Sequence, residues 1–357
     1  MQSKKVLLGM SGGVDSTVAA ILLKEQGYEV IGATMELWKD EYKQLENGCC
    51  STSVVEDAKK VCEALNIPHY VFDFKKEFKE CVIKDFIECY KNARTPNPCI
   101  ECNKYLKFNY FYKKALEIGC NYIATGHYAK TEYSEEYKQY ILKKSKSINK
   151  DQSYFLYNIP KEFLPNILFP LGEFKDKEQI REIAEKYNLQ VAKKPDSQEI
   201  CFIPDNNYNR FLLENLSEKP LSGNIIDKQG SIIGKHTGLI NYTIGQRKGL
   251  GIAYTEPLYV LKLDKENNLL IVGEENKLYS KNLIAENLNF LINIDFTKEI
   301  EVKAKIRYRA KEAQAILKIL EDGKAFVEFK EPQRAITKGQ SVVIYLNDTV
   351  AAGGKII

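Results

Sequence analysis

Apolar residues follow two alternating patterns over roughly the first 150 residues of the chain. Short apolar runs, typical of strands buried on both faces, predict strands over 6–10, 28–36, 69–74 and 121–126. Between them, apolar residues recur at helical spacing, which predicts helices over 16–26, 52–65, 75–91 and 102–118. Strands and helices that alternate in this way form a parallel sheet covered on both faces, and ligands bind beyond the carboxyl ends of its strands.

The rest of the chain has a β pattern. Short strands punctuated by glycine follow residue 206, and residues 301–309 alternate strictly between apolar and polar positions. This alternation predicts a half-buried strand with a basic outer face, which includes Arg307 and Arg309, and closure into a small barrel is expected. We therefore divide the chain into a Rossmann-like parallel-sheet α/β domain (1–205), a small β-rich central domain (206–278) and a C-terminal β-barrel (279–357).

Composition limits the class of protein. The chain has 357 residues, of which 44% are hydrophobic and 28% charged, as in an ordinary globular protein with two or three domains. We expect no membrane span, because no apolar run approaches about 18 residues, and no signal peptide, which favours the cytoplasm. The net charge of +4 is too small to establish a nucleic-acid partner, although basic residues cluster near the predicted barrel strand.

The string SGGVDS at 11–16 lies where the first predicted strand turns into a helix. Backbone N–H groups at a helix start are unpaired, and the helix macrodipole favours anions there. The glycine pair lets the backbone approach a phosphate, the flanking hydroxyl groups add donors, and Asp15 is a candidate Mg²⁺ ligand.

This loop differs from the other common nucleotide loops. It has no Lys-Ser or Lys-Thr after the second glycine, which excludes a Walker A loop, and no G-x-G-x-x-G follows a strand. The string resembles the signature of the PP-loop ATP pyrophosphatases, which split ATP between the α and β phosphates and adenylate a substrate. We therefore expect ATP and Mg²⁺ at this loop.

Three cysteines stand in unusual positions. Cys99 and Cys102 form a C-x-x-C motif after a proline-rich stretch, and Cys102 is predicted to open a helix with lysines nearby, which favours the thiolate. Cys201 lies in an apolar string with strand propensity. Four interpretations remain open: a catalytic pair of Cys102 and Cys201, a [4Fe–4S] cluster held by all three with one open iron position, half of a zinc site, or inert packing.

Taken together, these motifs identify a resemblance that covers nearly the whole chain. The chain resembles the tRNA-specific 2-thiouridylases, PP-loop enzymes that thiolate uridine 34 in tRNA anticodons. The resemblance rests on the loop at 9–16, RTPNP at 94–98, Cys102-Asn103, TGHY at 125–128, KDQSYF at 150–155, Ile200-Cys201-Phe202, TIGQR at 243–247 and IRYR at 306–309.

The family implies an ATP site and two catalytic thiols. The residues implied to hold ATP are Gly9, Met10, Ser11, Gly12, Gly13, Val14, Asp15, Ser16, Met35 and Gly126. The uridine O2 would attack the α-phosphate, and a cysteine desulfurase or sulfur-relay protein would load Cys201 with a persulfide. Sulfur transfer would leave a disulfide between Cys102 and Cys201.

The family also implies contacts with tRNA. Asn97, Pro98 and Cys99 would touch the flipped-out base. The other residues implied to contact tRNA are His127, Lys150, Asp151, Gln152, Arg307, Tyr308 and Gln340.

One position departs from the family. Many members have an aspartate at the position of Cys99, and the substitution adds a third thiol to Cys102 and Cys201, which raises the hypothesis of a [4Fe–4S] cluster that delivers the sulfur. Cys49 and Cys50 are expected in a surface loop, with an accessory redox role as the alternative. Two rival functions remain, a PP-loop amide-forming ligase and a non-catalytic RNA-binding protein.

Overall fold

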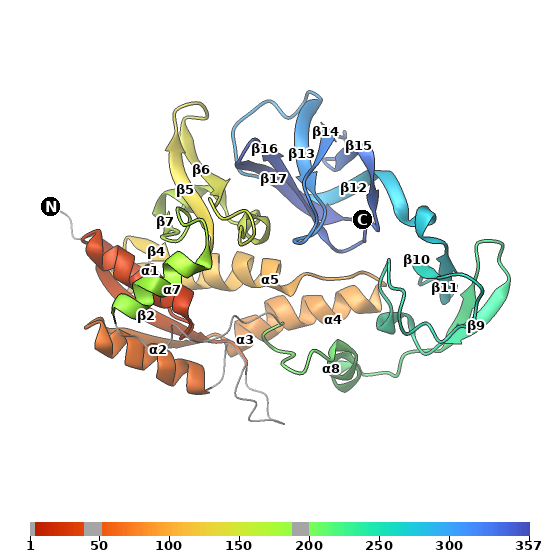
Figure 1. The fold of residues 1–357 in the computed structure, drawn as a ribbon, viewed down its shortest axis with the longest axis horizontal. Helices are drawn as coiled ribbons and strands as arrows, with labels where there is room; N and C mark the ends of the chain where they lie inside the picture. Colours follow the sequence, from red (N-terminus) through yellow and green to blue (C-terminus); the bar gives the residue numbers. More distant parts are fainter. Residues whose placement is uncertain (1–3, 39–51, 188–199) are drawn as a thin grey trace.

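The computed structural model describes residues 4–38, 52–187 and 200–357, so Cys49 and Cys50 lie outside the described residues. Figure 1 shows an α/β domain on one side, a barrel above and a small β domain beside it. In the described part of the chain, no helix has the length and apolar character needed to cross a membrane.

The first domain is built on a parallel sheet, as the sequence predicts, and its strand order is β3-β2-β1-β4-β7. The short fifth strand, β7, was not predicted. Its strands are β1 (Lys5–Gly9), β2 (Glu29–Glu36), β3 (His69–Asp73), β4 (Tyr122–Ala124) and β7 (Ile167–Leu168). Side chains alternate along β1, so that Val6 and Leu8 pack on one face and Leu7 on the other.

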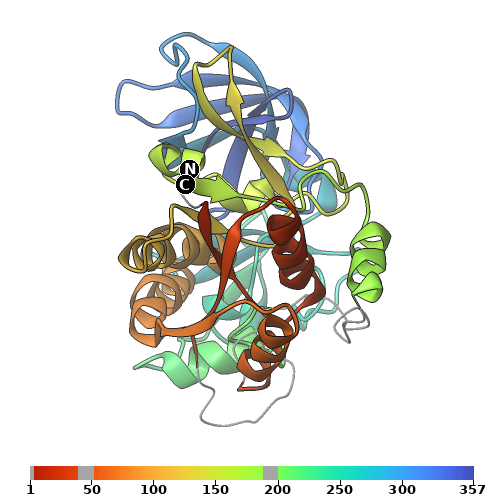
Figure 2. The same ribbon diagram turned by 90° about the vertical axis from the view of Figure 1, so that its left-hand side faces the viewer.

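Helices cover both faces of this sheet (Figure 2). On the face of Val6 and Leu8 lie α1 (Val14–Glu25), α2 (Thr52–Ala64) and α7 (Lys177–Lys186). On the other face lie two long helical segments, each with a π-helical stretch. The first consists of α3 (Lys75–Phe78), η1 (Lys79–Ile83) and α4 (Lys84–Lys91), and the second of α5 (Pro98–Glu101), η2 (Cys102–Tyr110) and α6 (Phe111–Glu117).

The start of the second segment corrects a prediction. Its helix begins at Pro98 rather than at Cys102, because proline lacks only an N–H that has no intrahelical partner in the first turn. Cys99 therefore lies in the first turn, and Cys102 lies one turn further along. The apolar string at Cys201 also differs from the prediction, since it forms a turn and not a strand.

The central domain follows helix α8 (Tyr208–Asn215). Its sheet has the order β10-β11-β8-β9. The strands are β8 (Gly223–Ile226), β9 (Ile232–His236), β10 (Tyr259–Asp264) and β11 (Leu269–Gly273).

The C-terminal domain is an antiparallel barrel, as predicted. Its strands run in the order β12-β15-β14-β13-β16-β17, and the pairing of β12 with β17 closes it. Their bounds are β12 (Tyr279–Phe290), β13 (Ile300–Lys305), β14 (Ala313–Ile319), β15 (Ala325–Arg334), β16 (Ser341–Leu346) and β17 (Thr349–Ile356). The predicted strand at 301–309 ends at Lys305, so Arg307 and Arg309 do not lie on its outer face.

A hairpin of the first domain joins the barrel. Strands β5 (Ala129–Ser134) and β6 (Gln139–Lys144) extend the barrel sheet through Lys143, which pairs with Thr349 of β17. Below the hairpin, one apolar core contains Leu106 and Tyr154 of the first domain and Tyr345 of the barrel. The two domains are therefore packed on each other without a break in the core.

Candidate functional site

The loop between β1 and α1 is folded by its own hydrogen bonds. Gly12 has a φ of +64°, and a Cβ there would lie 3.0 Å from both Asp57 Cβ and Val54 O, so the turn requires glycine. Ser16 Oγ and Thr17 Oγ1 donate to Gly13 O at 3.1 and 2.9 Å, and Ser11 N donates to Ser16 Oγ at 3.2 Å. These hydrogen bonds hold the loop at the positive end of α1.

The other predicted nucleotide residues surround this loop. Gly126 follows β4, and a Cβ on it would lie 2.9 Å from Ser16 N, so residue 126 must be small to approach α1 so closely. A Cβ on Gly9 would lie 3.8 Å from Met35 Cε, which places Met35 beside the end of β1. Met10 and Val14 are buried, so their side chains belong to the core and only their backbone can serve a ligand.

Asp15 is held by two residues from distant parts of the chain. Its carboxylate accepts a hydrogen bond from Tyr128 Oη at 2.8 Å and forms an ion pair with Lys177 Nζ at 3.1 Å. Gln152 braces Tyr128, because Gln152 Oε1 accepts from Tyr128 N at 2.9 Å and Gln152 N donates to Tyr128 O at 2.8 Å. The TGHY and KDQSYF motifs therefore support the loop at 11–16.

Sequence reasoning missed Lys177. Its side chain is only 10% exposed, and it lies in the first turn of α7. A lysine in the first turn is unfavourable beside the positive end of the helix macrodipole unless an anion is close by. Its position at the start of a predicted helix is therefore the signal that could have pointed to Lys177.

The three predicted cysteines differ in exposure. Cys99 is exposed, Cys102 is buried at the start of the π-helical stretch η2, and Cys201 is half-buried. Cys102 is part of the main apolar core, and Cys201 packs against the same core. π-helical turns occur often at functional sites, because they redirect the side chains of one helix face.

These cysteines do not form a metal site in the structure. Among residues 4–38, 52–187 and 200–357, no three His, Cys, Asp or Glu side chains form a group that could hold a metal ion. The described residues therefore support neither a [4Fe–4S] cluster on Cys99, Cys102 and Cys201 nor a zinc site.

Comparison with known proteins adds a second kind of evidence. Three family models match the chain: tRNA methyl transferase HUP domain over residues 4–205, tRNA methyl transferase PRC-barrel domain over 209–274, and aminomethyltransferase beta-barrel domain over 280–356. Three similar proteins are described as tRNA-specific 2-thiouridylase MnmA or, for the one from Caldanaerobacter subterraneus, MnmA 2. The one from Acetivibrio thermocellus is 55% identical over 100% of both chains. Those from Caldanaerobacter subterraneus and Clostridioides difficile are 53% and 50% identical over 99% of this chain and 98% of theirs.

This chain belongs to the tRNA-specific 2-thiouridylase family.

The residues that the thiouridylase resemblance assigns to tRNA mostly make contacts within the protein. Gln340 Nε2 donates to Thr95 O and Pro96 O, both at 3.0 Å. Arg307 Nη2 donates to Arg334 O and Ala335 O, at 2.5 and 2.8 Å, and burial lowers the pKa of its guanidinium group. Arg307 therefore holds the chain where it leaves β15, and Gln340 holds the segment that precedes α5.

The KDQSYF motif is also largely internal. The buried Asp151 carboxylate accepts hydrogen bonds from Ser145 N at 3.0 Å and Ser153 Oγ at 2.8 Å, and burial raises its pKa. Tyr308 packs its ring against Phe155, with the ring centroids 4.4 Å apart. Lys150, half-buried, is close enough to Tyr308 to lower the pKa of its hydroxyl, against the larger opposite effect of burial.

His127 lies between aromatic rings. Its ring packs against Phe108 and Phe169, and its Nδ1 is 2.7 Å from Thr125 Oγ1. Burial lowers the pKa of His127 well below its usual range, and the charge of Lys107 acts in the same direction. The imidazole is therefore neutral at physiological pH, which excludes it as a cation for a phosphate group.

Asn97 and Pro98 lie at the start of the helix that carries the cysteines. Asn97 is the N-cap residue of α5 and is half-buried, and Pro98 is buried. One turn later, Asn103 donates from Nδ2 to Phe155 O at 3.0 Å, which ties this helix to the KDQSYF motif.

Proposed function

We propose that this chain replaces the O2 oxygen of the wobble uridine of tRNA with sulfur, at the expense of ATP. The observation that carries the proposal is the combination, in one domain, of a glycine loop at a helix N-terminus with Cys102 and Cys201 on one apolar core. An amide-like oxygen is a poor leaving group, and adenylation makes it a good one. The thiols then supply the replacing atom.

The steps follow from these two parts. The uridine O2 attacks the α-phosphate of ATP, and pyrophosphate leaves. Mg²⁺, for which Asp15 is the candidate ligand, would offset the negative charge of the phosphates. The terminal sulfur of a persulfide on Cys201 attacks C2, and AMP leaves. The Cys102 thiolate attacks Sγ of Cys201, which forms the Cys102–Cys201 disulfide and releases the thiolated base. An external thiol reduces the disulfide, and a cysteine desulfurase or sulfur-relay protein loads the next persulfide.

The contacts of the predicted tRNA residues divide them into two groups. We propose that Asn97, Pro98 and Cys99 contact the target base and that Lys150, Tyr308 and the neutral His127 contact the RNA. The side chains of Asp151, Gln152, Arg307 and Gln340 are engaged within the protein, which favours a positioning role for these four residues. We also propose that residues 1–205 form the catalytic domain and residues 279–357 the tRNA-binding domain, with residues 206–278 as the domain between them. The protein is proposed to act in the cytoplasm.

The rival function is an amide-forming ligase, which also needs a PP-loop. Purified protein, ATP and transcribed tRNA would be assayed for pyrophosphate release, and the tRNA nucleosides analysed by mass spectrometry after a persulfide donor is added. Release that depends on tRNA, followed by 2-thiouridine, supports the proposal. Release that depends on an amine donor supports the ligase, and no release supports a non-catalytic RNA-binding protein.

A further inference from the structure

The segment 94–102, which carries Cys99 and Cys102, is held by the barrel at its first residues. Thr95 N donates to Lys338 O at 2.8 Å, and Gln340 Nε2 donates to the carbonyl groups of Thr95 and Pro96. Gly339 has a φ of +90°, and a Cβ there would lie 2.9 Å from Thr95 O. The backbones of the two domains therefore meet directly at this point.

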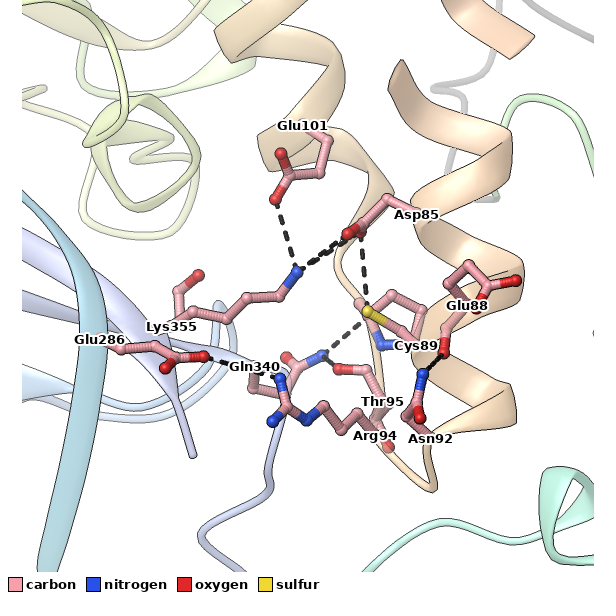
Figure 3. A network of polar contacts seen from close by, with 12 residues as sticks. Asp85, Glu88, Cys89, Asn92, Arg94, Thr95, Glu101, Glu286, Gln340 and Lys355 are labelled. Atoms are coloured by element: carbon pink, nitrogen blue, oxygen red, sulfur yellow. Dashed lines mark hydrogen bonds and ion pairs between the residues drawn. The ribbon is translucent and has the colours of Figure 1, made fainter. Parts of the chain in front are cut away.

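The barrel holds the same segment a second time, at Glu101 (Figure 3). Lys355 of β17 places its Nζ 3.1 Å from Asp85 Oδ1 on α4 and 3.9 Å from Glu101 Oε1 on α5. Glu101 immediately precedes Cys102 in the sequence. One ammonium group thus connects the barrel to two helices, one of which carries the thiol.

The charges at this contact depend on Lys355. Burial raises the pKa of Glu101 and the charge of Asp85 raises it further, whereas Lys355 and Lys104 lower it. Burial lowers the pKa of Lys355, but the carboxylates of Asp85 and Glu101 act in the opposite direction and the pKa is raised overall, so its charge persists. Removal of the ammonium group would leave two half-buried carboxylates without their shared counter-charge, and such a loss is strongly destabilising at the site.

The side chains around Lys355 are mostly polar or charged. Lys355 lines a cleft of about 470 Å³ between α4 and the barrel. The cleft is lined by Asp85, Glu88, Cys89, Asn92, Arg94 and Lys355. Burial raises the pKa of the Cys89 thiol to about 11, so Cys89 is neutral there and cannot substitute for a carboxylate or a cation.

The two contacts belong to one edge of the barrel. Gly339 N donates to Ile356 O and Ile356 N donates to Gln340 O, both at 2.8 Å. The strand end that carries Lys355 is therefore hydrogen-bonded to the segment that holds Thr95 and Pro96.

We propose that Lys355 is a positioning residue for sulfur transfer, because it fixes through Glu101 the helical turn that presents Cys102. Lys355 and the 338–340 segment both belong to the barrel and both hold the segment 94–102. The position of the Cys102 thiol therefore depends on the position of the barrel. This inference rests on the proposed function. Since adenylation of the base needs no thiol, the two steps of the reaction respond differently to a loss of Lys355.

The test compares Lys355→Met, Lys355→Arg and the control Lys330→Met, which changes an exposed lysine of β15. We expect Lys355→Met to lower kcat for 2-thiouridine formation at least about tenfold, since small displacements of a reacting group have large effects on rate. Pyrophosphate release dependent on tRNA, and KM for tRNA, should stay within about threefold of wild type. Lys355→Arg should restore most of the activity, and Lys330→Met should retain it.

A second variant separates positioning from a general loss of structure. Glu101→Gln removes the charge that Lys355 neutralises, so the double variant Lys355→Met/Glu101→Gln should thiolate faster than Lys355→Met alone. Unchanged thiolation in Lys355→Met, or an equal loss of thiolation and pyrophosphate release, overturns the inference. Absence of tRNA-dependent pyrophosphate release in the wild-type protein instead overturns the proposed function.

Discussion

The ammonium group of Lys177 lies 3.1 Å from the carboxylate of Asp15, a residue 162 positions earlier in the chain. Asp15 is in the first turn of α1 and Lys177 in the first turn of α7. The loop at 11–16 contains no lysine of its own. The fold therefore brings a cation to this loop from another helix.

The first prediction concerns this lysine. Lys177→Met should lower kcat/KM for ATP in pyrophosphate release by about tenfold to a hundredfold, because a cation aimed at transferring phosphates stabilises the charge that develops on them. The matched control is Lys186→Met in the last turn of the same helix. Equal kcat/KM values for Lys177→Met and wild type would show that Lys177 serves only to hold Asp15.

The second prediction concerns Arg307. A direct phosphate contact would lower the slope of tRNA affinity against salt by about one charge when the arginine is removed. The hydrogen bonds of Arg307 to Arg334 O and Ala335 O instead predict an unchanged slope for Arg307→Ala and a loss of about 1.5–3 kcal/mol in stability. Filter binding across salt concentrations and thermal unfolding distinguish the two, and a reduced slope with unchanged stability would contradict the structural role.

The third prediction concerns pH. The pKa of His127 is lowered by burial in the folded protein, whereas the unfolded chain has the ordinary value of about 6.5. The unfolded state therefore binds more protons, and the contribution of His127 to stability falls as the pH drops below about 6.5. His127→Asn should unfold with a shallower dependence of Tm on pH between about 6.5 and 5. Parallel curves for variant and wild type would refute a neutral imidazole with a lowered pKa.

Much of the first domain could be predicted because its signals are local. The apolar run at Val6 to Leu8 and the glycine pair after it specify a strand, a turn and a helix start within a few residues. The hairpin of β5 and β6 was missed, because Tyr133 and Tyr140 are exposed and its pairing partner Thr349 lies in the barrel. The alternating pattern predicted Arg307 on a strand face, because its hydrogen-bond partners, Arg334 O and Ala335 O, are likewise not visible from the local pattern. Strand β13 ends at Lys305, and Arg307, two residues further on, donates to carbonyl groups of a distant segment.

The cysteines show the same limit. Their residue types and the C-x-x-C spacing could be seen in the sequence, but the exposure of each could not. Cys99 is exposed and Cys102 is buried only three residues later. Residues at this spacing are neighbours on one helix face, so the difference comes from the core that packs against Cys102 and not from the helical repeat.

The most direct test of the account is mass spectrometry of tRNA nucleosides from cells whose sole copy of the enzyme carries Cys102→Ser or Cys201→Ser. Cys81→Ser is the matched control, because Cys81 is half-buried against the same apolar core. Each of the two site variants should lose 2-thiouridine from the wobble position while the purified proteins still release pyrophosphate with tRNA and ATP, and the control should keep both activities. Fully thiolated tRNA from both site variants would contradict sulfur transfer by this pair of thiols.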